Sequence, residues 1–124
     1  MERFSFGSEV AFVPRGDLLD GVTVAPLTSP FEAGAPTQAA IFRFAPGGRI
    51  VRHPAGDLPQ ILAVLDGSGE VSGEEGVAAA ITAGEAVYLR AGEEHEMTSR
   101  DGLTVLIMEG ESLDRFRPSP ADTP

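Results

Sequence analysis

Short apolar segments separated by glycine and proline run through the whole chain. No stretch of more than nine residues lacks both of these residues, whereas an average helix runs about 11 to 12 residues. Several segments are rich in Val, Ile, Phe and Thr, which favour β-strands: residues 21–25, 40–44, 49–52, 60–65 and 103–108. The pattern predicts an all-β chain.

Three turn sequences fit hairpin connections between antiparallel strands. They are Pro-Gly-Gly at 46–48, Glu-Glu-Gly at 74–76 and Asp-Gly at 101–102. Many short strands at this spacing predict a sandwich or a barrel. One short helix is expected at 112–117, capped by Ser112 and ended by Pro118.

Two of the expected strands are apolar at consecutive positions, 61–65 and 105–108. Both of their faces should therefore be covered, one by the interior and the other by another sheet or subunit. A homodimer would supply that cover.

The length of 124 residues fits one domain. We expect it to span 1–117, with 1–20 as N-terminal strands or an arm and 118–124 as a flexible tail. The formal net charge of −10 argues against binding to nucleic acid or to anionic membranes. No apolar run approaches a membrane span and no secretory signal pattern is present, so a cytoplasmic protein is expected.

Cysteine and lysine are both absent, which excludes disulfides, thiolate chemistry and lysine Schiff bases. Any metal must therefore bind to nitrogen and oxygen. The chain also has no dinucleotide fingerprint and no phosphate-binding glycine loop, so no nucleotide cofactor is expected.

The chain has only two histidines, and each lies in a segment with regularly spaced glycines. The first segment contains Gly47, His53, Ala55, Gln60 and Gly67. It resembles the first motif of the cupin superfamily, with Ala55 at the position of a second histidine and Gln60 at the position of a glutamate.

The second segment resembles the second cupin motif. Gly84, Gly92 and His95 match it, whereas Arg90 replaces a proline and Ser99 an asparagine. The resemblance implies a cupin-like double-stranded β-helix, or jelly-roll, barrel.

By this resemblance, His53, Gln60 and His95 would hold a divalent metal inside the barrel. Imidazole nitrogen and amide oxygen suit Zn, Fe, Ni or Mn. One imidazole and one carboxylate of the usual cupin site are missing, so a pocket without metal stays open as the alternative.

Each of these three residues also has a simpler interpretation. His53 and Gln60 could be polar groups at strand ends, and His95 could be a surface histidine charged by the neighbouring Glu94 and Glu96. Strand alternation answers the last point, because both glutamates point outward if His95 points inward.

The same alternation places Met97 and Ser99 on the face of His95, and Leu62 on the face of Gln60, so these three are expected to line the pocket. Tyr88, the only tyrosine, is expected to line it as a hydrogen-bond donor. Met97 could instead be core packing, and Tyr88 could pack with its hydroxyl at the rim. Four arginines flank the motifs, namely Arg43, Arg49, Arg52 and Arg90. An inward arginine would select a carboxylate ligand, whereas outward ones would balance an acidic surface.

Two functions follow from these residues. The first is a protein that binds a small molecule of unknown identity in the barrel, with or without a metal. The alternative is a metal-dependent oxygenase, isomerase or lyase acting on a small organic substrate.

Overall fold

The computed structural model describes residues 1–117 of the chain. A single 3-10 turn, η1 (Ser8–Val10), precedes seven strands. The strands are β1 (Leu19–Pro26), β2 (Thr37–Pro54), β3 (Gln60–Ser72), β4 (Ala78–Thr82), β5 (Ala86–Leu89), β6 (Glu94–Thr98) and β7 (Leu103–Gly110). Within the described part, no helix is long and apolar enough to cross a membrane.

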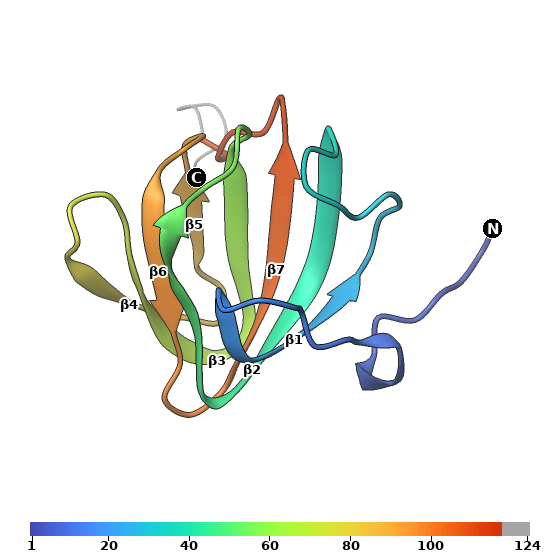
Figure 1. Ribbon diagram of the computed structural model, residues 1–124, viewed down its shortest axis with the longest axis horizontal. Coiled ribbons are helices and arrows are strands. Elements are labelled where there is room, and N and C mark those ends of the chain that lie inside the picture. The colour runs from blue at the N-terminus through green and yellow to red at the C-terminus, as the bar shows by residue number, and fades with distance from the viewer. Residues whose placement is uncertain (118–124) are drawn as a thin grey trace, which may run out of the picture.

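The pairing of the strands closes on itself to form a barrel (Figure 1). β2 pairs with β6, β6 with β3, β3 with β7, and β7 again with β2, all antiparallel. The long strands β2 and β3 make this possible, because different parts of each pair with different neighbours. The prediction of an all-β jelly-roll barrel is confirmed.

One of the three predicted hairpins is confirmed. Residues 74–76 join β3 to β4, and the two strands pair directly from Ser72 and Ala78 onward. By contrast, Asp101 and Gly102 join β6 to β7, which pair with β2 and β3 but not with each other.

The expected hairpin at 46–48 is wrong, because β2 continues through it in the same direction. The pairing with β1 jumps from Val22–Phe44 to Asp20–Arg49, so residues 45–48 bulge out of the ladder. The Gly47 amide donates to the Ser99 carbonyl, 2.8 Å away. The turn sequence therefore bends a strand that passes to a new neighbour.

The helix expected at 112–117 is also wrong. Only a turn at 111–112 follows β7. A segment of six residues gains too few hydrogen bonds to offset the cost of nucleating a helix, and these residues are mostly exposed. Residues 118–124, predicted as a flexible tail, lie outside the described residues.

The inward faces of the strands form one apolar core. Its buried members are Val22, Phe44, Ile50, Leu62, Val64, Val71, Ile81, Leu89, Met97, Leu103 and Val105. Phe42 and Ile107 pack against this core and are half-buried. The strand ends beyond these two residues carry the polar groups described next.

Candidate functional site

His53 and His95 lie directly opposite each other on β2 and β6. An irregularity in β2 produces this arrangement. Ile50 pairs with Met97, and the next pair is His53 with His95, so three steps on β2 match two on β6. The extra residue is a β-bulge. It turns both Ile50 and His53 inward, which an uninterrupted strand would not allow.

The two imidazoles form a close pair whose tautomers are fixed by the backbone. Their ring centroids are 4.5 Å apart. The Nδ1 of His53 donates to the Val51 carbonyl at 2.7 Å, and that of His95 to the Glu93 carbonyl at 3.1 Å. Because a carbonyl oxygen can only accept, each neutral ring presents the lone pair of its Nε2.

Burial lowers the pKa of His95, outweighing the opposing effect of its hydrogen bond to Glu93, and the nearby His53 lowers it further. His95 is 2% exposed. The buried imidazole is therefore neutral at pH 7. The surface-charged interpretation of His95 does not hold.

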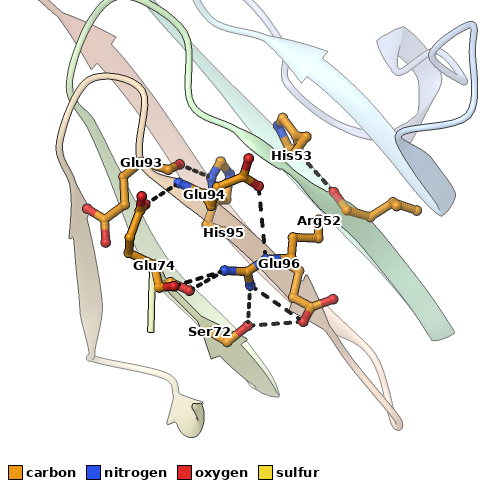
Figure 2. Close-up of polar contacts among 10 residues, drawn as sticks. Arg52, His53, Ser72, Glu74, Glu93, Glu94, His95 and Glu96 are labelled. Carbon is orange, nitrogen blue, oxygen red and sulfur yellow. Dashed lines mark hydrogen bonds and ion pairs between the residues drawn. The ribbon is translucent and has the colours of Figure 1, made fainter. Parts of the chain in front are cut away.

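The carboxylates beside His95 point to the outside, as strand alternation predicted. Glu94 and Glu96 lie within 3.9 and 3.8 Å of the Arg52 guanidinium (Figure 2). Arg52 also donates to the Ser72 hydroxyl at 3.2 Å and to the Gly73 carbonyl at 2.6 Å. This outer network joins β2, β3 and β6 behind the two histidines.

Gln60 takes part in a different polar group, which joins β2, β3 and β7. Its Nε2 donates to Oε1 of Glu109 at 3.2 Å, and Nε2 of Gln38 donates to Oε2 of Glu109 at 2.7 Å. β7 lies between β2 and β3, with Glu109 opposite both glutamines. One carboxylate is thus held between two amides.

Sequence reasoning missed Gln38 and Glu109. A signal for Glu109 was present, because it is the one charged residue of β7 and alternates with Val105 and Ile107. That spacing places its side chain on the inward face. No comparable signal marked Gln38, which depends on how β2 pairs with β7.

These three polar side chains open into a cavity of about 390 Å³. Its lining comprises Leu18, Phe31, Glu32, Ala33, Gln38, Phe42, Gln60, Ile107 and Glu109. The wall at Leu18 is linked to the histidines, because Val51 donates to the Leu18 carbonyl and accepts from His53. Cavities of this size and mixed character are typical of small-molecule sites.

The four residues predicted to line the pocket pack in the core or lie against backbone carbonyls. Leu62 and Met97 are fully buried in the apolar core. The Ser99 hydroxyl donates to the Ser68 carbonyl, and the Tyr88 hydroxyl lies 3.5 Å from the Leu113 carbonyl. None of the four lines the 390 Å³ cavity. Contact between them and a ligand stays a prediction.

The donor set does not fit the metal site that the motifs imply. Among residues 1–117, no group of three or more His, Asp or Glu side chains is placed to hold a metal ion. Ala55 supplies no donor, and Gln60 supplies at most a neutral amide oxygen, because its Nε2 donates to Glu109. The site therefore has two imidazoles and an amide in place of the imidazoles and carboxylate that the motifs imply, and a neutral amide is a poorer ligand for a divalent cation than a carboxylate.

Comparison with known protein families gives one decisive match. The family of the cupin domain matches residues 40–109, which is more than half of the chain and includes both histidines. The chain is a cupin. No curated protein is similar enough in sequence to match it.

Solved structures show the same fold. The cupin domain of Schizosaccharomyces pombe Cnp3 has a TM-score of 0.64 and 12% identity, over 75% of this cupin and 66% of that chain. A predicted oxalate decarboxylase from Thermotoga maritima has a TM-score of 0.64 and 22% identity, over 73% and 80%. The polyketide cyclase RemF from Streptomyces resistomycificus has a TM-score of 0.74 and 23% identity, over 88% and 78%.

This cupin therefore spans just under two thirds of the Cnp3 domain and more of the other two chains. At these identities, the likenesses establish the fold alone.

Proposed function

We propose that the chain is a small-molecule-binding cupin whose ligand occupies the 390 Å³ cavity at the open end of the barrel. The observation that carries this proposal is the composition of the cavity. Phe31, Phe42 and Ile107 supply apolar walls, and Gln60 and Glu109 supply polar groups at one end. Apolar walls with a few converging polar groups are what a small organic ligand needs.

A metal-dependent enzyme is the second candidate, and one specific observation favours it. The imidazoles of His53 and His95 have ring centroids 4.5 Å apart, and each is held by its Nδ1 on a backbone carbonyl, which leaves its Nε2 for a metal. Elemental analysis of purified protein separates the two candidates. Stoichiometric Zn, Fe, Ni or Mn that is lost in His95→Ala would favour the enzyme. Sub-stoichiometric metal, with no change in Tm when these metals are added, supports the binding protein.

We further propose that two copies associate. The chain exposes large apolar side chains near its N-terminus, with Phe4 at 70% and Val13 at 75% exposure, on a segment that leads away from the barrel (Figure 1). Outward Ile61 and Met108, paired on β3 and β7, are half-buried. Apolar surface of this kind is typical of protein interfaces.

A blocking variant tests the ligand site. Ala33 is exposed and lines the cavity, so Ala33→Trp fills the space without disturbing the core. Ala79→Trp is the matched control, because Ala79 is also exposed but lies on β4, away from the cavity. The probe is 2-phenylethanol, a neutral aromatic alcohol, followed by ¹H–¹⁵N NMR titration.

The proposal predicts saturable shifts at Phe42, Gln60 and Ile107 in the native protein and in Ala79→Trp. In Ala33→Trp these shifts should disappear. Equal binding of the probe in both variants would contradict the proposal.

A further inference from the structure

The charge around the cavity is of one sign. Two of its nine lining residues, Glu32 and Glu109, are acidic, and none is basic. All nine arginines of the chain lie within the described residues 1–117, and none of them lines the cavity.

The arginines near the motifs are engaged elsewhere. Arg43 donates to the Phe6 carbonyl, and Arg49 and Arg90 lie near Asp20 and Glu93. Arg52 belongs to the outer network described above. The cavity consequently offers no guanidinium to pair with a carboxylate ligand.

Glu109 retains acceptor capacity for a ligand. A carboxylate has about four lone-pair positions, and the two glutamine amides occupy one position on each oxygen. The amides hold the carboxylate in place, and the remaining positions are free of the hydrogen bonds described. A fixed carboxylate at the end of an apolar cavity is suited to accept hydrogen bonds from a cationic donor.

The approach to the cavity has the same charge. A neighbouring hollow of about 450 Å³ shares Ala33 and Glu109 with the cavity. It adds two further carboxylates, Asp57 and Glu111, and no basic side chain. Together with the net charge of −10, this arrangement attracts cations and repels anions. The aromatic residues Phe31 and Phe42 also suit a cation.

We propose that the cavity selects a small organic cation, an amine joined to an apolar or aromatic group, with its ammonium at Glu109. This inference rests on the proposed function, since it assigns the ligand class of the same cavity. It is opposite to the carboxylate ligand that an inward arginine would have selected.

Three probes of one skeleton test the charge preference. They are 2-phenylethylamine, 2-phenylethanol and phenylacetate, which are cationic, neutral and anionic at pH 7, and their affinities are measured by ¹H–¹⁵N NMR titration at low salt. A charge-assisted hydrogen bond predicts that the amine binds about tenfold more tightly than the alcohol. Phenylacetate should bind more weakly than the alcohol.

Glu109→Gln keeps the shape and one acceptor, so it should reduce amine affinity about tenfold and change alcohol affinity no more than about twofold. Glu70→Gln, an exposed site on β3, removes the same charge away from the cavity and should leave the tenfold preference intact. If Glu109→Gln does not fold, two measurements still test the proposal. One is the order of affinities of the three probes for the native protein. The other is Glu32→Gln, at an exposed lining residue, which should weaken binding of the amine and leave binding of the alcohol unchanged.

The outcomes separate the two proposals. Failure of all three probes to bind would overturn the proposed function itself. Binding of the alcohol with no advantage for the amine would overturn the selection of a cation. A preference that survives Glu109→Gln would overturn the placement of the ammonium at Glu109. Neither result would overturn the proposed function.

Discussion

The glycines of the two motifs adopt a backbone conformation that other residues avoid. Positive φ angles occur at Gly47, Gly67, Gly84 and Gly92, between 75° and 91°. L-residues with a side chain reach this region at a cost of roughly 1–2 kcal/mol. The spacing of the motifs therefore reflects the turns and the bulge between strands, in addition to the histidines they place.

Gly67→Ala should destabilise the fold far more than Gly84→Ala. Both sites have positive φ, but a Cβ at Gly67 would collide with the Gly102 carbonyl, whereas one at Gly84 meets nothing within 4 Å. We expect about 1 kcal/mol for Gly84→Ala and at least about 2 kcal/mol more for Gly67→Ala. Urea unfolding measures both, and equal losses would contradict this account of the motif.

Stability should fall as pH decreases below about 6.5, the ordinary pKa of histidine. Burial lowers the pKa of His95 in the folded state, so the unfolded chain takes up this proton first and stability increases with pH across the window. The slope from this group is at most about 1.4 kcal/mol per pH unit.

His95→Gln should remove that part of the slope below about pH 6.5. Urea midpoints measured in EDTA test it, because the chelator removes adventitious metal. An unchanged slope would mean that other groups cause the pH dependence.

At the scale of elements, the sequence predicted where most of the strands lie, but it did not predict which strands pair with each other. Alternation and turn residues are local, so they located most of the strands and oriented His95 and its neighbouring glutamates correctly. The bend at 46–48 was predicted to be a hairpin, because glycine and proline occur both in hairpin turns and in bulges within a strand. Gln38 and Glu109 are 71 positions apart, and their contact depends on β7 lying between β2 and β3.

The candidate site, too, was predicted only in part from the sequence. The spacing of His53 and His95 predicted their pairing in space, which the structure places 4.5 Å apart. Gln60 was expected to join them; its Nε2 donates to Glu109, and its part in a metal site with the histidines stays a prediction. Glu109 lies on β7, outside both motifs, so neither motif could predict this hydrogen bond.

Arg52→Met should cost about 1–2 kcal/mol, because it removes charged hydrogen bonds that join β2 to β3. Arg49→Met is the matched control. Arg49 lies on the same strand and its ion pair with Asp20, at 3.9 Å, is between exposed side chains, so less than about 0.5 kcal/mol is expected. Equal Tm changes for the two variants would contradict a structural role for the Arg52 network.

At the scale of the whole molecule, closure of the barrel brings segments far apart in sequence to one open end. The segment 31–33, the start of β3 and the end of β7 all reach the cavity. The ligand site therefore depends on the topology of the barrel, because Gln60 is the only residue of the two motifs in its lining.

The association of two copies predicts a solution mass of about twice the 13.0 kDa of one chain. Analytical ultracentrifugation over a range of concentrations measures this mass directly. A mass of one chain at every concentration would rule out the dimer.

The central claim is that the barrel binds a small ligand in the 390 Å³ cavity. A crystal structure of the protein soaked with 2-phenylethylamine tests it most directly. The account predicts electron density between Phe31 and Phe42, with the amine nitrogen roughly 3 Å from the Glu109 carboxylate. Density for the amine at another site, with this cavity filled by solvent at saturating ligand, would contradict it.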